Sequence, residues 1–325
     1  MENQLLADIQ QHKTIESVIS TDNLFIQANT IPVTLTEVQE THLIPVYVKD
    51  NEPVISHQEF IHSALEVVHQ IYKEEQILSP AIRVSHPIKG RIPDAKDKPA
   101  KDLLEHEKTI YFERMAFVIE IPTIRDTING NEITLTIGGV KSYSLDNLYN
   151  KKGVDEHFKI FIGFQNKVCC NLCVWSDGYV GDLRVKNVSQ LMKGIYDLVL
   201  RFNAEKQVYL MQNMLNYNLT EHEFATLIGR AKLYSYLPHQ EKKMIPPLVF
   251  GDNQISMVAK DYYNDQSFCR QEDGSINLWN LYNLFTGVNK QSYIDTFLDR
   301  GVNAYSFIQG LVYSMESKEK CWFLS

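Results

Sequence analysis

The stretch that decides the fold is TIYFERMAFVIEIPTIRDTINGNEITLTIGGVKSYS, residues 109–144. It contains two runs rich in β-branched and aromatic residues, 109–122 and 132–144, which favour strands. Between them stands NGN at 129–131, which is typical of a tight turn joining antiparallel strands. The stretch therefore predicts a β-hairpin on which a mostly antiparallel sheet is built.

A second hairpin is predicted downstream. FKIFIGF (158–164) and KVCCNLCVW (167–175) are its two arms, with a turn at Gln165-Asn166. SDG at 176–178 predicts a further turn, after which DLRV favours a short closing strand. Upstream, HLIPVYV (42–48) and AIRVSH (81–86) favour strands.

Three of the five cysteines, Cys169, Cys170 and Cys173, crowd into this second hairpin. A structural zinc needs four ligands, yet Cys269 and Cys321 are isolated and no second pair is present. Side chains alternate in a strand, so three cysteines divided between its two faces do not converge. Core packing in a central strand buried on both faces is the favoured interpretation, and a metal or redox centre is the alternative.

Helical periodicity marks the remaining parts of the chain. Residues 57–75 predict a helix with one apolar and one polar face, whereas 87–102 contain three prolines and a glycine and favour a loop. From about 188 the period changes to 3.6, beginning with one long helix. We expect Thr220 with Glu223, and Asp252, to cap later helices. The predicted class is α+β: an N-terminal extension (1–40), a sheet domain with a packed helix (41–187) and an α-helical domain (188–325).

Composition indicates an ordinary globular chain: 325 residues, 44% hydrophobic and 22% charged, with a net charge of −8. No apolar run approaches the roughly 18 residues that span a bilayer, and the polar start MENQLLADIQQHKTIE does not resemble a signal peptide. The odd, crowded cysteines favour a reducing, cytoplasmic setting. Residues 1–80 hold 3 Lys and Arg against 12 Asp and Glu, so the acidic excess belongs to the N-terminal quarter.

A basic stretch is the candidate binding surface. Six cations face two acids between residues 83 and 101, a local balance of +4. Lysines beside a sheet suit a phosphate backbone, and strand aromatics suit stacking on bases, although basic loops are common and strand aromatics usually pack in cores. The nucleic-acid-binding candidates are Arg83, Lys89, Arg91, Lys96, Lys98, Lys101, Lys151, Lys152, Tyr111 and Tyr143, with Phe112 and Tyr149 as further stacking candidates.

Evidence for catalysis is weaker. His62, Glu66 and His69 share one helical stripe and could hold a metal with help from another element, but a solvated polar face explains them as well. Glu105, Glu107, Glu113 and Glu120 form no recognisable acid–base pair. Hydrolase, P-loop and dinucleotide motifs are missing from the sequence. We therefore expect no catalytic residues and no cofactor, and lean towards a protein that is not an enzyme.

Several runs together resemble a known family. They are KGRIPDAKDKPAKDLL, KTIYFERMAFVIEIP, NGNEITLTIGGVKSY, FKIFIGFQNKVCCNLCVWSDG, LTEHEFATLIGR, LWNLYNLFTGVNKQSYIDTFLDR and CWFLS. They resemble an uncharacterised family of bacterial mobile-element proteins, domain of unknown function 3871. The strand around VCCN and the helix LWNLYNLFT are similar, more distantly, to phage- and plasmid-like proteins. The resemblance implies a conjugative-element or phage setting, and no catalytic residue.

The basic stretch and the family resemblance together favour a DNA-linked accessory protein of a mobile element. We expect it to bind single-stranded DNA, in an annealing or recombination role. A sheet followed by a long helix is also the outline of phage annealing proteins, which is an analogy of fold alone. A protein-interaction module, such as an anti-defence or regulatory factor using LWNLYNLF, is the alternative. A metal-dependent enzyme is a second alternative. No membrane partner is expected, and an oligomer is compatible with the sequence.

Overall fold

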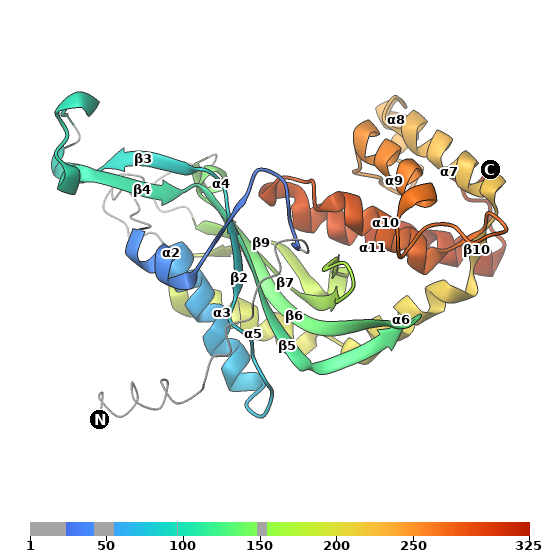
Figure 1. Cartoon of the computed structure of the whole chain (residues 1–325), viewed down its shortest axis with the longest axis horizontal. Helices are drawn as coiled ribbons and strands as arrows, with labels where there is room; N and C mark the ends of the chain where they lie inside the picture. Colours follow the sequence, from blue (N-terminus) through green and yellow to red (C-terminus); the bar gives the residue numbers. More distant parts are fainter. Residues whose placement is uncertain (1–23, 42–54, 96, 148–154) are drawn as a thin grey trace.

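The structure, a computed structural model, describes residues 24–41, 55–95, 97–147 and 155–325. Within these residues a seven-stranded antiparallel sheet is flanked by helices, mostly from the second half of the chain (Figure 1). The fold is α+β, as predicted; the strand expected at 42–48 lies outside the described residues. The strands of this sheet are β1 (Ile31–Val33), β2 (Ala81–Val84), β5 (Arg114–Ile128), β6 (Asn131–Ser142), β7 (Glu156–Asn166), β8 (Leu172–Cys173) and β9 (Tyr179–Val185).

The hairpin predicted from the central stretch is formed by β5 and β6. The two strands run antiparallel, with Ile119 opposite Ile137. Between them Asn129 and Gly130 have φ values of 50° and 76°. Left-handed backbone at both central residues is what a type I′ turn requires, which is why Asn-Gly is favoured there. The hairpin prediction is confirmed.

One face of the sheet is covered by α3 (His57–Ile71) and α5 (Val188–Arg201). The ring of Phe60 on α3 packs edge-on against Phe117 of β5 and Phe158 of β7, with centroids 5.0 and 4.9 Å apart. The apolar arc predicted for this helix is therefore its buried face. The helix ends a few residues before the predicted limit of 75.

The close approach of α3 explains a glycine in β6. A Cβ atom on Gly139 would lie 2.4 Å from Cζ of Phe60 and 2.6 Å from the backbone oxygen of Lys159. Both distances are well inside van der Waals contact, so only glycine leaves room for the ring. The helix thus packs directly on the backbone of the sheet.

The opposite face of the sheet is covered by the first turns of α11 (Ile294–Ser317). Two carboxylates on this helix reach cations on the sheet: Asp295 pairs with Arg114 of β5 and Asp299 with Lys159 of β7, each at 2.5 Å. The apolar residues of this layer include Ala116, Val118, Val140, Phe161, Phe297 and Leu298. Because helices cover both faces, the middle of the sheet is fully enclosed.

The central strand is β7, not the strand that carries the cysteines. β7 pairs with β6 on one side and with both β8 and β9 on the other, and all its residues are buried. Strand β8 is only two residues long. Cys170 has a φ of 55°, and its N–H donates to the backbone oxygen of Asn166 at 2.7 Å. The chain therefore turns over residues 167–171, and the prediction of a central cysteine strand is wrong.

Helices dominate from α5 onward, as predicted. The single long helix expected from 188 is interrupted after α5, because Oδ1 of Asn203 accepts a hydrogen bond from the backbone N–H of Lys206 and starts a new helix. The box of Thr220 and Glu223 is confirmed, whereas Gly251 rather than Asp252 occupies the cap position of α9. The later helices are α6 (Ala204–Asn213), α7 (Glu221–Tyr234), α8 (His239–Lys242), α9 (Asp252–Asn264), α10 (Leu278–Asn289) and α11.

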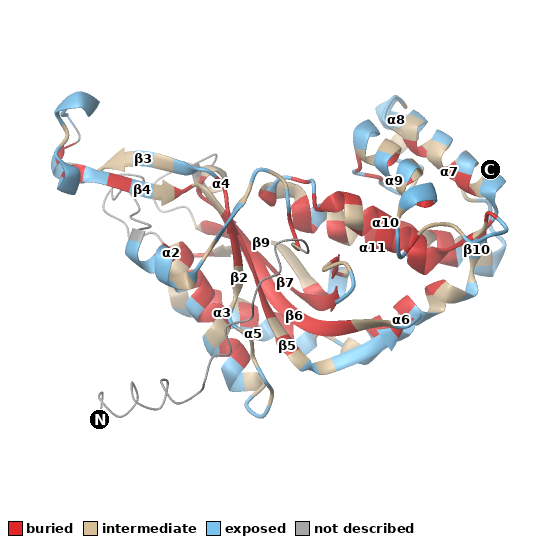
Figure 2. Ribbon diagram, in the orientation of Figure 1, coloured by how far each residue is buried: buried red, intermediate tan, exposed pale blue. Residues whose placement is uncertain are grey.

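Helix α10 is deeply buried (Figure 2). Trp279, Tyr282 and Phe285 are each 0% exposed, and the same apolar cluster extends to Phe117 on the sheet. The expectation that LWNLYNLF is an exposed interaction surface is wrong, because its side chains form the centre of the helical half. This apolar cluster is continuous across residue 187. The domain boundary predicted there stays a prediction.

An arm of two strands, β3 (Pro87–Arg91) and β4 (Lys108–Phe112), projects from one end of the sheet (Figure 1). The loop predicted for 87–102 is therefore wrong in its first part, since Pro87 and Gly90 sit within a strand. A proline is tolerated here because it is the first residue of a strand in a two-stranded sheet. Beyond the strands, 93–107 carry three short 3₁₀ turns.

Candidate nucleic-acid interface

One face of the arm carries a group of cations. Antiparallel partners point to the same side of a ribbon, and Lys89 pairs with Ile110 while Arg91 pairs with Lys108. These four residues therefore share one face. Lys89, Lys108 and Ile110 are exposed and Arg91 is half-buried. The arrangement places three positive charges around one apolar side chain, and we call it the arm face.

The tip beyond the strands is held by its own ion pairs. Lys98 forms a salt bridge with Glu107. The hydrogen bond within this pair lowers the pKa of the Glu107 carboxyl group. The guanidinium of Arg91 donates to the backbone oxygen of Lys98, and Glu105 pairs with Lys108 at 2.5 Å. These bonds fold the tip back onto the strands. The arm is a defined structure rather than a free basic loop.

The same ion pairs reduce the charge of the arm. The balance of +4 over 83–101 ignores Asp102, Glu105 and Glu107, which follow directly in the chain and lie on the same arm. Over 87–112 the six cations face five acids, a net charge of +1. The positive character is therefore local to the arm face. Exposed ion pairs contribute little energy, so a phosphate can replace a carboxylate there at small cost.

The predicted binding residues divide into four groups. Lys98 and Lys101 are exposed near the tip, and Lys89 and Arg91 lie on the arm face. Arg83 is away from the arm, 5% exposed, with its guanidinium donating to the hydroxyl and the backbone oxygen of Thr30. The remaining predicted cations and one aromatic lie outside the described residues: Lys96, Lys151, Lys152 and Tyr149.

The predicted stacking aromatics lie mostly inward. Tyr143 is 3% exposed and its ring stacks on His57 with centroids 4.7 Å apart. Burial raises the pKa of Tyr143 well above its usual value. Phe112 is 7% exposed and Tyr111 is half-buried, with its ring 6.2 Å from that of Tyr143. A ring packed in this way is not presented to a nucleotide base, so the arm offers phosphate contacts more than stacking.

A buried ionic network at the base of the arm was not anticipated from the sequence. Lys141 of β6 is 0% exposed, and its Nζ lies 2.6 Å from Oδ2 of Asp146 and 2.9 Å from Oε2 of Glu156. The ammonium also lies 4.1 Å from the centre of the Phe158 ring. The one sequence signal was a lysine at an inward position of an apolar strand. A single cation lies between two carboxylates, and all three side chains are buried, so the network presents no charge to the solvent.

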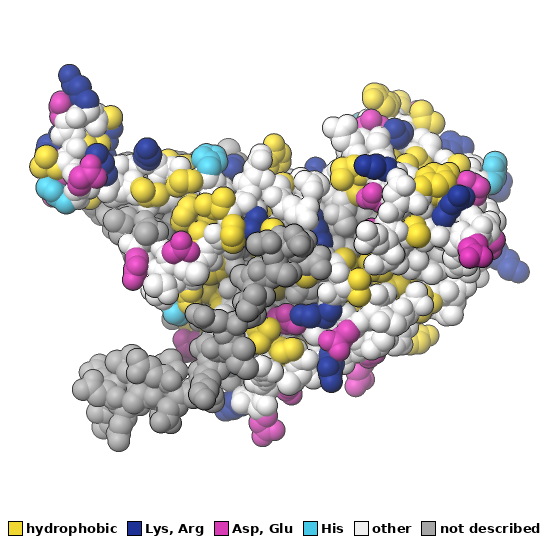
Figure 3. All heavy atoms as spheres, viewed as in Figure 1, with side chains coloured by type: hydrophobic (Ala, Val, Ile, Leu, Met, Phe, Trp, Pro, Cys, Tyr) yellow, Lys and Arg dark blue, Asp and Glu magenta, His cyan; other side chains and the backbone are white. Residues whose placement is uncertain are grey.

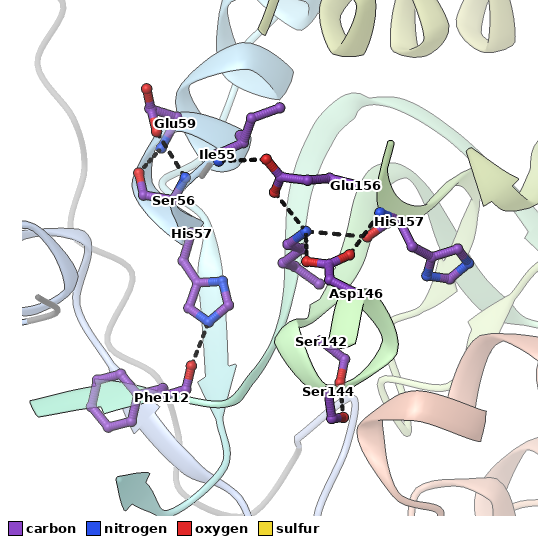
Figure 4. A network of polar contacts seen from close by, with 11 residues as sticks. Ile55, Ser56, His57, Glu59, Phe112, Ser142, Ser144, Asp146, Glu156 and His157 are labelled. Carbon is purple, nitrogen blue, oxygen red and sulfur yellow. Dashed lines mark hydrogen bonds and ion pairs between the residues drawn. The ribbon is translucent and has the colours of Figure 1, made fainter. Parts of the chain in front are cut away.

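The network is tied to neighbouring elements through backbone groups. Oε1 of Glu156 accepts from the N–H of Ile55, and Oδ1 of Asp146 accepts from the N–H of His157, at 3.0 and 2.8 Å. Nearby, Nε2–H of His57 donates to the backbone oxygen of Phe112, the last residue of β4, at 2.8 Å (Figure 4). These bonds connect α3, β7 and the arm. The network therefore positions the base of the arm and has no exposed reacting group.

The candidate metal ligands do not come together. His62 is exposed and bonds to Gln39 at 3.0 Å, and the stripe it shares with Glu66 and His69 lies on the polar side of α3. Within the residues that the structure describes, no three His, Cys, Asp or Glu side chains are grouped to hold a metal ion. The helical stripe thus gives no support to a metal-dependent enzyme.

In the second hairpin the thiol of Cys173 is buried, and those of Cys169 and Cys170 are half-buried. Cys173 is 0% exposed, and burial raises the pKa of Cys169 to about 11. A reactive thiol needs a lowered pKa and access to solvent. The burial and the raised pKa therefore favour a packing role for these cysteines over a reactive one.

The turn that carries the cysteines docks on α10 through asparagines. Nδ2 of Asn171 donates to the backbone oxygen of Asn283 at 3.0 Å, and Nδ2 of Asn166 donates to Oδ1 of Asn283 at 3.2 Å. Nδ2 of Asn283 in turn donates to the backbone oxygen of Trp279. The VCCN and LWNLYNLFT runs are thus in direct contact, although Asn171 and Asn283 are 112 residues apart in the sequence.

Comparison with protein families places this chain in a family to which no activity is assigned. The model of the family described as "Domain of unknown function, B. Theta Gene description (DUF3871)" matches residues 9–324. The chain therefore belongs to this family. No curated protein and no solved structure matches it. In the part of the chain that the structure describes, a helix of the length and apolarity needed to cross a membrane is not found.

Proposed function

We propose that the protein is a DNA-linked accessory protein of a mobile genetic element, acting in the cytoplasm without catalysis, and that it binds single-stranded DNA. An annealing or recombination role fits a protein that holds a strand without modifying it. The observation that carries the proposal is the arm face, which gathers Lys89, Arg91 and Lys108 around Ile110 on a projecting ribbon.

The chemistry of the arm face suits a phosphate backbone. Each Lys or Arg that neutralises a phosphate releases a condensed counterion, which favours binding at low salt. The arm is fixed at its base by the His57–Phe112 bond and folded back at its tip by the Lys98–Glu107 pair. Binding therefore orders few side chains, which limits its entropic cost.

The experiment is a fluorescence-anisotropy titration of a labelled oligonucleotide. Lys89→Glu/Arg91→Glu reverses two charges of the arm face, and Lys186→Glu/Lys193→Glu reverses two exposed charges at α5 as the matched control. We expect the arm variant to lose about tenfold or more in affinity and the control to stay within about twofold, since base-independent affinity follows local phosphate neutralisation. Equal affinity of the two variants would remove the arm from the proposal.

A protein-interaction module remains the alternative proposal. Leu104 and Ile110 on the arm are 55% and 42% exposed and could contact a protein as well as a strand. A partner recovered from host lysate after nuclease treatment, and lost with Leu104→Ser/Ile110→Ser, would favour this alternative.

A further inference from the structure

A second projecting surface lies at the junction of α7 and α8. Tyr236 and Met244 are 80% and 86% exposed, and Leu233 is 57% exposed. Single exposed apolar residues are common, whereas three within a segment of 12 residues make this segment a candidate contact surface. Figure 3 shows apolar and Lys or Arg side chains together over this end of the molecule. We call residues 233–244 the helical tip.

Cations accompany these apolar side chains. Lys243 is exposed and Lys242 is half-buried, against Glu241 as the single acid of the helical tip. Upstream, Nζ of Lys232 forms an exposed ion pair with Asp252 at 3.6 Å. The helical tip is therefore mildly positive, although residues 186–325 as a whole are neutral, with 14 cations and 14 acids.

The helical tip is held in one conformation. Nζ of Lys242 donates to the backbone oxygen of Ser235 at 2.8 Å and lies 5.5 Å from the centre of the Tyr234 ring. The N–H of Tyr236 donates to the backbone oxygen of Leu233 at 3.0 Å. These bonds tie α8 back to the end of α7. The ring of Tyr236 is thus presented to solvent by a fixed turn.

We infer that the helical tip is a second contact for the same single strand, with Tyr236 stacking on a base and Lys243 neutralising a phosphate. The inference rests on the proposed function and supplies what the arm lacks, because the arm aromatics are packed inward. Exposed aromatic rings and cations in the same surface segment are the combination that binds single strands without sequence preference, and Tyr236 and Lys243 are both exposed in the helical tip. The arm and the helical tip project to the same side of the molecule, and its outline is hollowed between them (Figures 1 and 3).

The test uses the full chain and two oligothymidines, about 8 and about 30 nucleotides long, a range chosen to bracket the site sizes of single-strand binders. Tyr236→Ala/Lys243→Glu alters the helical tip, and Tyr236→Phe keeps the ring as the conservative variant. Both positions are exposed, so folding is preserved. We expect the altered tip to weaken binding of the long strand by about tenfold or more, since one stacked base accounts for a factor of this order. The Tyr236→Phe variant should bind as the unmodified protein does.

The length of the oligothymidine distinguishes the arm contact from the helical-tip contact. The short strand should bind the arm and be weakened far less by the altered tip than the long strand. A long strand carrying 5-iododeoxyuridine should crosslink to the peptide that contains Tyr236. If the protein binds DNA but the altered tip leaves the affinity for the long strand unchanged, the helical tip is not a DNA contact and the arm proposal stands. If the unmodified protein binds neither strand, both proposals are overturned.

Discussion

Lys141 and Glu156 form an ion pair inside the protein, with Nζ 2.9 Å from Oε2 and side chains 0% and 1% exposed. A buried charge is tolerated only when it is paired and hydrogen-bonded, and Asp146, the backbone oxygen of His157 and the Phe158 ring also surround the ammonium. The pair joins β6 to the start of β7, close to where the arm leaves the sheet. Its role is to hold this end of the sheet.

Replacing Lys141 by methionine should destabilise the protein strongly. The substitution keeps most of the length of the side chain but removes the ammonium group, so two buried carboxylates lose their cation, and breaking a buried pair costs about 3–5 kcal/mol. The measurement is the free energy of unfolding in urea, followed by circular dichroism. Lys193→Met, at an exposed position of α5, is the control and should be close to neutral. A loss below about 1 kcal/mol, the range of exposed pairs, would show that Lys141 is hydrated.

Two glycines should respond to alanine in opposite directions. At Gly139 a methyl group collides with the Phe60 ring and the sheet backbone, and overpacking of this kind costs about 1–3 kcal/mol. At Gly229, inside α7, nothing lies within 4 Å of the added Cβ, and alanine in a helix gains up to about 1 kcal/mol over glycine. Thermal unfolding of both variants measures the difference. A stable Gly139→Ala variant would contradict the close packing of α3.

Asn171→Ala should weaken the contact between the cysteine turn and α10. The side chain is 1% exposed, and its removal leaves the backbone oxygen of Asn283 without this donor. Loss of one buried partner costs about 1–3 kcal/mol. The exposed Asn264→Ala is the matched control for urea unfolding. Equal stability of the two variants would mean that the asparagine contact does not hold the turn.

Alkylation should distinguish packed cysteines from reactive ones. Because burial raises the pKa of Cys169 to about 11, the thiolate is scarce at pH 8 and becomes abundant only as the pH rises through 11. Cys173 is enclosed as well. Mass spectrometry after iodoacetamide treatment at pH 8 should find both sites at least about tenfold slower in the folded chain than in urea. Rapid labelling of Cys169 in the folded protein would restore the redox alternative.

Local patterns in the sequence predicted the fold where the physical cause is local. Asn129 and Gly130 dictate their own turn, and Thr220 with Glu223 cap their own helix, so both were readable. Strand β3 was missed because Pro87 and Gly90 argue for a loop, and its partner β4 begins only at Lys108. The β-rich run 109–122 includes most of β4, but no local signal shows that residues 109–112 pair with β3.

The candidate site was only partly readable for the same reason. Charge counting found Lys89 and Arg91 but could not show that Lys108 joins them by register, or that Glu105 and Glu107 fold back onto the same arm. The aromatic pattern could not distinguish the buried Tyr143 from the exposed Tyr236. Exposure of a side chain depends on what other segments cover it, which is a property of the folded chain.

The salt dependence of single-strand binding tests the central claim most directly. Anisotropy titrations with a labelled oligothymidine of about 8 nucleotides, which should occupy the arm alone, between about 50 and about 200 mM salt should give a log–log slope of about −2 for the unmodified protein, as expected when about three phosphates are neutralised. The Lys89→Glu/Arg91→Glu variant should bind more weakly and with a shallower slope. No binding at about 50 mM salt and micromolar protein, or binding that does not change with salt, would contradict the account.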